Sequence, residues 1–182
     1  MKKKTAIILF MLFLAVFAGL LPVYAQRAPI DVNLIIDGSA SLSPVKNEIS
    51  TWIDGRFNQI LIDGDRVTVW NAGNSAIVVF TGRIEGNARE AVKKSIQDIS
   101  PSGSVPDFSS ALREAQSRQS SPFSYTLLIC ASPSALSSTI NSTQGNLLRF
   151  SRIEEFSNWR ALVVGLNLDT RVRRAASAFI NN

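Results

Sequence analysis

The sequence has no histidine and a single cysteine, Cys130, among its 182 residues. Without histidine, the chain cannot build the Ser-His-Asp or Cys-His arrangements that activate a nucleophile. Zinc likewise lacks its usual ligand set. Because one cysteine cannot close an internal disulfide, the apolar core must hold the protein together. Cys130 lies in the apolar run YTLLICA, which predicts a small core side chain.

The formal net charge of the chain is +5, but part of this positive charge is concentrated at the N-terminus. The rest of the chain is therefore less basic than this value suggests. Lys2, Lys3 and Lys4 precede the apolar run TAIILFMLFLAVFAGLLP, which is followed by VYA. This pattern predicts a signal peptide over residues 1–25, with cleavage before Gln26 that leaves a net charge of +2. The alternative is an uncleaved anchor, since the apolar run approaches the length that spans a bilayer. We therefore expect an exported protein, periplasmic or extracellular, that meets the membrane only through this segment.

Residues 26–182 have the length of one domain with a proper core. Their small net charge does not favour nucleic acid as a partner. The basic stretch DTRVRRAA is short and lacks the interleaved aromatic residues on which bases stack. We interpret it as a solvated helix face, and we predict no nucleic-acid partner.

Apolar runs alternate with helical patterns along this domain. Strands are expected at 32–37, 66–70, 76–82, 124–131 and 160–167, and helices at 44–61, 87–99, 107–119, 147–159 and 169–182. Alternating strands and helices predict an α/β fold that is doubly wound, with a mostly parallel central sheet and helices on both faces. The turn NAGNS is too short for a parallel return, so the strand after it is expected to be one antiparallel edge strand.

The first predicted strand runs directly into DGSAS, which places Asp37, Ser39 and Ser41 at its carboxyl end. In such sheets, ligands bind outside the carboxyl ends of the strands. One carboxylate and two hydroxyls are suitable ligands for a hard cation such as Mg²⁺ or Mn²⁺, and Asp107 would add a second carboxylate if it turned into the site. The alternative is structural: Asp37 makes a turn, Ser41 and Ser43 satisfy free N–H groups of the next helix, and Asp107 caps its own helix.

Five segments follow one another in the order VNLIIDGSASL, LIDGDRVTVWNAGNSAIVVFTGRI, GSVPDFSSALREA, YTLLICASPSA and ALVVGLN. In this order they resemble the von Willebrand factor type A domain, also called the integrin inserted domain. The resemblance implies a metal-ion-dependent adhesion site that includes Asp37, Ser39 and Ser41, where a carboxylate of a protein partner completes the coordination. The site is degenerate, because Pro106 stands where the family has a threonine. The segment 131–133 (Ala-Ser-Pro) replaces the family's Thr-Asp-Gly-like turn.

The resemblance implies a non-catalytic domain for protein binding or adhesion that uses the loops at 37–43, 102–107 and 131–145. Two alternatives stay open. One is a structural docking subunit of an envelope complex with no metal. The other is a hydrolase that uses the same crevice, although no histidine and no suitably placed lysine is available to activate Ser39. We predict that the protein is not an enzyme. The binding hypothesis requires Asp37 at the rim of the sheet and a hairpin over 66–82.

Overall fold

The computed structural model describes residues 28–118, 123–132, 134–136 and 151–164. Its six-stranded sheet has the order β3-β2-β1-β4-β6-β5. The strands are β1 (Asp31–Asp37), β2 (Arg66–Ala72), β3 (Ala76–Arg83), β4 (Ser124–Cys130), β5 (Ser151–Glu155) and β6 (Arg160–Val164). The helices are the short 3-10 helix η1 (Ala40–Leu42), α2 (Lys46–Ile60), α3 (Ala88–Gln97) and α4 (Phe108–Ser117).

The central strand β1 pairs in parallel with β2 on one side and with β4 on the other. The next strand, β3, returns antiparallel on β2 through a turn at 73–75, so the predicted hairpin is confirmed. Strand β1 is almost continuously buried, because both of its faces are covered.

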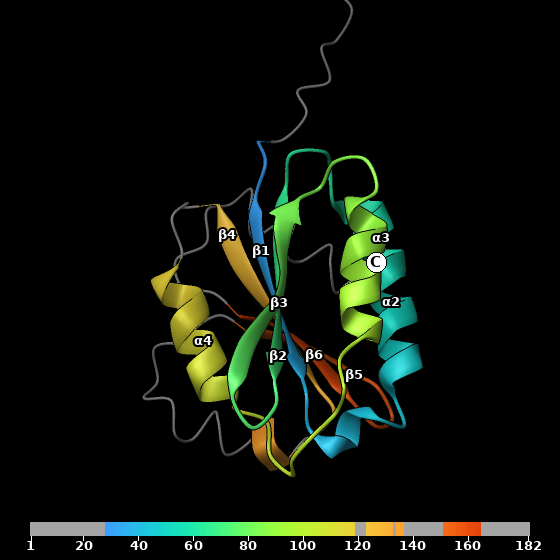
Figure 1. Ribbon diagram of the computed structural model, residues 1–182, viewed down its shortest axis with the longest axis vertical. Helices are drawn as coiled ribbons and strands as arrows, with labels where there is room; N and C mark the ends of the chain where they lie inside the picture. The colour runs from blue at the N-terminus through green and yellow to red at the C-terminus, as the bar shows by residue number, and fades with distance from the viewer. Residues whose placement is uncertain (1–27, 119–122, 133, 137–150, 165–182) are drawn as a thin grey trace, which may run out of the picture.

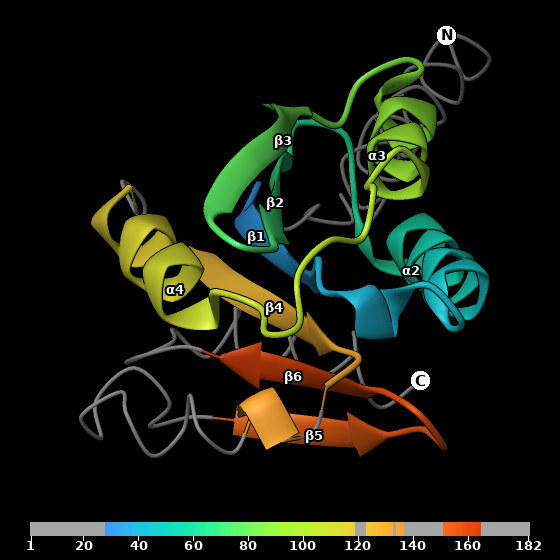
Figure 2. The ribbon, with the colours of Figure 1, turned by 60° about the horizontal axis from the view of Figure 1, so that its bottom comes forward.

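Helices cover both faces of the sheet, as Figures 1 and 2 show: α2 and α3 lie on one face and α4 on the other. Alternate residues of β1 supply the two cores. Leu34 and Ile36 pack in the cluster with α2 and α3, whereas Ile35 packs with Trp70 and Phe108 under α4. The predicted α/β class, with mostly parallel strands and helices on both faces, is confirmed.

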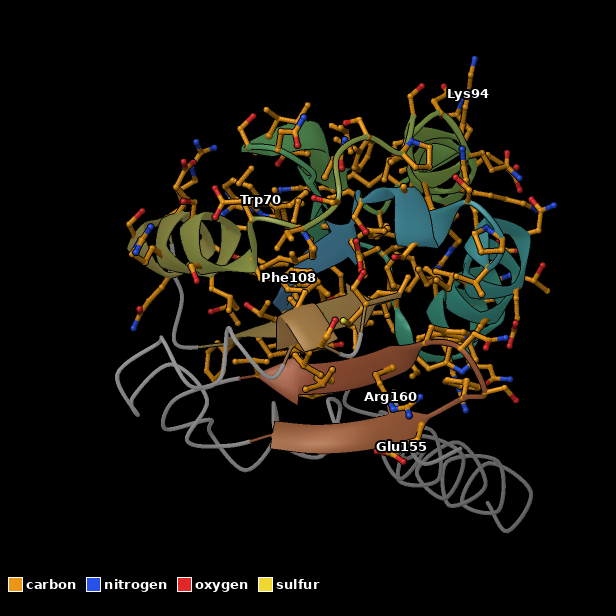
Figure 3. The ribbon with its side chains drawn as sticks, turned by 90° about the horizontal axis from the view of Figure 1, so that it is seen from below. Trp70, Lys94, Phe108, Glu155 and Arg160 are labelled. Carbon is orange, nitrogen blue, oxygen red and sulfur yellow. The ribbon has the colours of Figure 1, made fainter. Side chains whose placement is uncertain are left out.

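The C-terminal part of the sheet differs from the prediction. The helix expected at 147–159 is wrong, because β5 and a tight turn occupy this segment. Strand β6 pairs antiparallel with both β4 and β5, so the sheet has a second antiparallel strand besides β3. The backbone N–H of Phe156 donates to the carbonyl of Trp159 at 3.0 Å, which closes a two-residue hairpin loop. Beside it, Arg160 and Glu155 form an ion pair at 3.4 Å (Figure 3).

Long-range aromatic packing explains the error. The three-residue spacing of Phe156 and Trp159 is also typical of one face of a helix, which is why the pattern predicts one. In the structure their rings stack at 3.8 Å, and Trp52 of α2 packs edge-on against both. These contacts join the hairpin to a helix about a hundred residues earlier, which no local pattern reveals. The predicted helix at 169–182 and most of the loop at 132–145 lie outside the described residues.

The start of α2 also differs from the expectation. Ser43 and Pro44 lie in a turn after η1, and α2 begins at Lys46 with Val45 at its N-cap and no side-chain cap bond. Ser43 therefore does not cap this helix. Within the described ranges, no helix combines the length and the apolar composition needed to cross a bilayer.

Candidate functional site

Four segments meet at the carboxyl ends of β1, β2 and β4, and we call them the rim: residues 38–43, 73–77, 100–107 and 131–132. Three backbone hydrogen bonds join the first three of these segments. The N–H of Ser102 donates to the carbonyl of Gly38 at 2.8 Å, that of Ala40 to Gly103 at 3.0 Å, and that of Asp107 to Gly73 at 3.0 Å. Figure 3 looks onto this end of the molecule. The rim is thus a connected surface held by its own backbone.

Asp37 lies at the end of β1 beneath this surface, and its side chain is completely buried. One carboxylate oxygen accepts a hydrogen bond from the N–H of Ser39 at 2.9 Å, and the other accepts one from the N–H of Ala131 at 2.9 Å. A buried carboxylate needs such charge-assisted bonds to offset its lost hydration. Asp37 therefore ties the turn after β1 to the segment after β4, although it lies deeper than the binding hypothesis required.

Ser39 and Ser132 meet beside this carboxylate. Both are buried, and their hydroxyls share a hydrogen bond of 3.1 Å. The Cys130 thiol donates to the carbonyl of Ser132 at 3.0 Å. Burial is the main cause that raises the pKa of Cys130 to about 12, so the thiol stays protonated and unreactive at neutral pH.

Asn71 and Gly38 are in close contact on the other side of the turn. A Cβ atom at Gly38 would lie 1.8 Å from Oδ1 of Asn71, so a larger residue here would force the Asn71 side chain to move. The same Oδ1 atom is buried and finds no hydrogen-bond partner among the described residues. An orphaned buried oxygen is unusual, and here it lies next to the predicted cation site.

The remaining two predicted ligands have other surroundings. Ser41 is exposed within η1. Asp107 is half-buried, and its Oδ1 accepts a hydrogen bond from the N–H of Ser110 at 3.1 Å, so it caps α4. In the described ranges, no group of three or more histidine, cysteine or acidic residues could hold a metal ion. A cation site of Asp37, Ser39, Ser41 and Asp107 stays a prediction.

Sequence reasoning missed two residues of this site, Asn71 and Ser132. Asn71 was interpreted as the start of a turn, but it belongs to β2 and pairs with Ile77. Ser132 lies within the loop at 131–145 that was predicted to bind, but its bond to Ser39 was not predicted. A polar residue near the carboxyl end of a buried strand is the signal that both share, and it becomes useful only once the strand order is known.

The rim also carries exposed apolar side chains. Among the residues that the structure describes, Ile77 and Val105 are the large hydrophobic residues that are exposed, by 51% and 60%. Ile77 is the second residue of β3, next to the turn at 73–75, and Val105 lies in the connection between α3 and α4. Both belong to the rim, although they come from different segments of the chain.

Comparisons with known proteins find similar solved structures. No family model and no curated protein matches the chain. Solved structures similar to it include a von Willebrand factor type A protein from Catenulispora acidiphila, with a TM-score of 0.46 and 19% identity, covering 68% of this chain and 32% of that one. The von Willebrand domain of the type V pili tip protein Mfa5 from Porphyromonas gingivalis has a TM-score of 0.42 and 14% identity, covering 74% and 47%.

A third similar structure is proximal thread matrix protein 1 from the mussel byssus, whose MIDAS motif is occupied by zinc. Its TM-score is 0.42 at 16% identity, covering 50% of this chain and 25% of that one. The chain thus spans less than half the length of each of these three proteins. The function has to be inferred from the residues of this chain.

Proposed function

We propose that this chain is an exported, non-catalytic domain that binds a protein partner with its rim. The observation that carries the proposal is the position of Ile77 and Val105. Single exposed hydrophobic residues are common on protein surfaces. Here, both exposed large side chains of the described residues belong to rim segments, Ile77 at the start of β3 and Val105 between α3 and α4, near the end of the sheet where ligands of this architecture bind.

The construction of the rim supports binding. Its segments are joined by backbone hydrogen bonds, and beneath them the Asp37 carboxylate connects two of the turns. A surface that is ordered before it meets a partner loses less conformational entropy on binding. Buried polar bonds below and apolar side chains above are therefore a suitable arrangement for a docking site.

The chemistry of the site supports a non-catalytic function. The Ser39 hydroxyl is bonded to another hydroxyl, that of Ser132, and the chain has no histidine to act as its base. The Cys130 thiol is buried, and its pKa of about 12 keeps it from acting as a nucleophile. Export is supported by the basic and apolar pattern of residues 1–25.

A pair of substitutions tests the rim. Ile77→Asp combined with Val105→Asp should weaken binding at least about tenfold, because both contacts lose apolar area and gain charge. Ala91→Asp is the matched control, since Ala91 is exposed on α3 and is not part of the rim. Affinity capture from the native host, with mass spectrometry, should recover a protein with wild type and with Ala91→Asp but not with the rim variant. Equal recovery by the rim variant, at unchanged thermal stability, would contradict the proposal.

Cation-assisted docking is the second candidate, and the orphaned Oδ1 of Asn71 favours it. Mg²⁺ or Mn²⁺ would take this oxygen with Asp37 and Ser39, and also with Ser41 and Asp107 if they turned inward. A bound cation would supply positive charge for a carboxylate of the partner. Thermal unfolding with Mg²⁺, Mn²⁺ or EDTA tests this version, because a ligand of the native state must raise the melting temperature. An unchanged melting temperature at millimolar metal would leave docking without a metal.

A further inference from the structure

The amino ends of the strands border a cavity of about 380 Å³. It is lined by residues of β1, β2, β3 and β4 and by Arg118, the C-cap residue of α4. The volume falls in the range of small-molecule sites, about 300–1,000 Å³. The cavity lies at the end of the strands opposite the rim, so it is separate from the proposed protein-binding surface.

The face of the sheet that borders the cavity has an apolar half and a polar half. In the carboxyl half, Ile35, Trp70 and Leu128 pack against the apolar side of α4. In the amino half, the same alternating positions of these strands carry Asn33, Thr68 and Ser124, which line the cavity. Strands covered on both faces are normally apolar throughout. A polar block on three neighbouring strands, including the central one, departs from this pattern.

Asn33 is the most unusual residue of this block, because it belongs to the central strand β1. Its Oδ1 accepts a hydrogen bond from the indole N–H of Trp70 at 3.4 Å. An indole nitrogen can only donate, so this bond fixes the orientation of the carboxamide and leaves the amide N–H₂ group as the donor available to the cavity. Nearby, the hydroxyls of Thr68 and Thr81 share a hydrogen bond of 3.1 Å.

The charged residues of the lining are two arginines and one aspartate, and each arginine has an acidic partner. Arg66 pairs with Asp31 at 3.2 Å. Arg118 pairs with Glu114 of α4 at 3.2 Å, and its guanidinium carbon lies 4.9 Å from the centre of the buried Trp70 ring. A guanidinium has five N–H donors, so the bond to Glu114 leaves others for a ligand of the cavity. Planar guanidinium groups match carboxylate and phosphate oxygens.

From this combination of donors, we propose that the cavity binds a small organic anion that carries a carboxylate or phosphate group together with hydroxyls. Arg118 contacts the anionic group, and Asn33 and Thr68 contact the hydroxyls. Both anionic groups offer a guanidinium two oxygens for a bidentate contact, so probes of each kind decide between them.

Isothermal titration of the protein with citrate, glucose 6-phosphate and inorganic phosphate tests the proposal. We expect at least one of the three to bind saturably, at one molecule per chain. Tighter binding of citrate would identify a carboxylate ligand, and tighter binding of either phosphate compound would identify a phosphate ligand. The absence of saturable binding by all three would overturn the proposal.

Matched variants locate the bound anion. Arg118→Gln should weaken binding about tenfold or more, because it removes a charge-assisted hydrogen bond. Arg113→Gln, an exposed arginine of the same helix that does not line the cavity, should change the affinity less than about twofold. Thr68→Val keeps the shape of the side chain but removes its hydroxyl, and should weaken binding several-fold. Equal losses in both arginine variants, or no loss in Thr68→Val, would overturn the proposal.

Discussion

Two completely buried aspartates stand at opposite ends of the sheet, Asp37 at the carboxyl end and Asp65 at the amino end. Their bonding is alike. The oxygens of Asp37 accept hydrogen bonds from the N–H groups of Ser39 and Ala131, and those of Asp65 accept from Ile30 and Ile62, all at 2.9 Å. Hydrogen bonds of this kind hold a turn in place at both ends of the sheet. A buried carboxylate at the end of a strand is therefore not in itself evidence of a binding site.

The two carboxylates differ in the residues that surround them. Asp65 belongs to a tight turn in which Gly64 has a φ of 92°, a conformation that favours glycine. Near Asp37 lie the hydroxyl pair of Ser39 and Ser132 and the orphaned oxygen of Asn71, covered by a rim with exposed apolar side chains. A function at the carboxyl end is inferred from these surroundings and not from the carboxylate.

The largest expected effect comes from replacing each carboxylate by its amide. Asp37→Asn and Asp65→Asn should each lower the free energy of unfolding by about 2–4 kcal/mol, because a donor then faces a buried N–H group. Urea unfolding of the two variants gives the comparison. Similar losses would support a shared structural role. A large loss for Asp65→Asn with none for Asp37→Asn would show that Asp37 is retained for binding alone.

A smaller effect is expected at the turn itself. Gly38→Ala should lower the free energy of unfolding by about 1–3 kcal/mol, because the new methyl group overlaps Oδ1 of Asn71. Gly55→Ala is the matched control in the interior of α2, where nothing lies within 4 Å of the added Cβ, and it should stabilise the protein by about 0.5–1 kcal/mol.

A double-mutant cycle identifies the cause of the loss at Gly38. Because Asn71→Ala removes the overlapping oxygen, Gly38→Ala should cost less in that background than in wild type. Equal costs in the two backgrounds would show that the backbone of the turn, and not Asn71, requires glycine at this position.

The smallest effect is a dependence on pH that belongs to the carboxyl end alone. The pKa of Cys130 is raised by burial from an ordinary 9.0 to about 12 in the folded protein. Between these values the unfolded chain loses the thiol proton while the folded chain keeps it, so stability falls as the pH rises. Cys130→Ala should show a shallower loss of unfolding free energy above pH 9 than wild type. Identical slopes would mean that the thiol is not shielded from water.

The sequence was informative where a local pattern determines the structure. The short turn at 71–75 allowed only a hairpin, and the side chain of Asp107 could be expected to cap α4 because it precedes a helical pattern directly. The function of Asn71 and Ser132 could not be predicted in this way. Ser39 and Ser132 are 93 positions apart, and they meet only because β4 pairs beside β1.

The polar lining of the cavity is a similar case. Asn33, Thr68 and Ser124 are unremarkable within their own strands, and a single polar residue in an apolar run has many explanations. Their shared position on one face follows from the register in which Asn33 lies opposite Thr68, while Asp31 of the same strand lies opposite Ser124. Register depends on contacts between distant segments, so it is not visible in any one stretch of sequence.

The most direct test of the binding rim is photo-crosslinking in the native host from two single positions. A photoreactive amino acid at Val105 should form a specific covalent adduct with a partner protein, because this side chain is exposed on the rim. The same amino acid at Ala91, exposed on α3, should form none. An adduct from Ala91 with none from Val105 would contradict the assignment of the binding surface to the carboxyl end of the sheet.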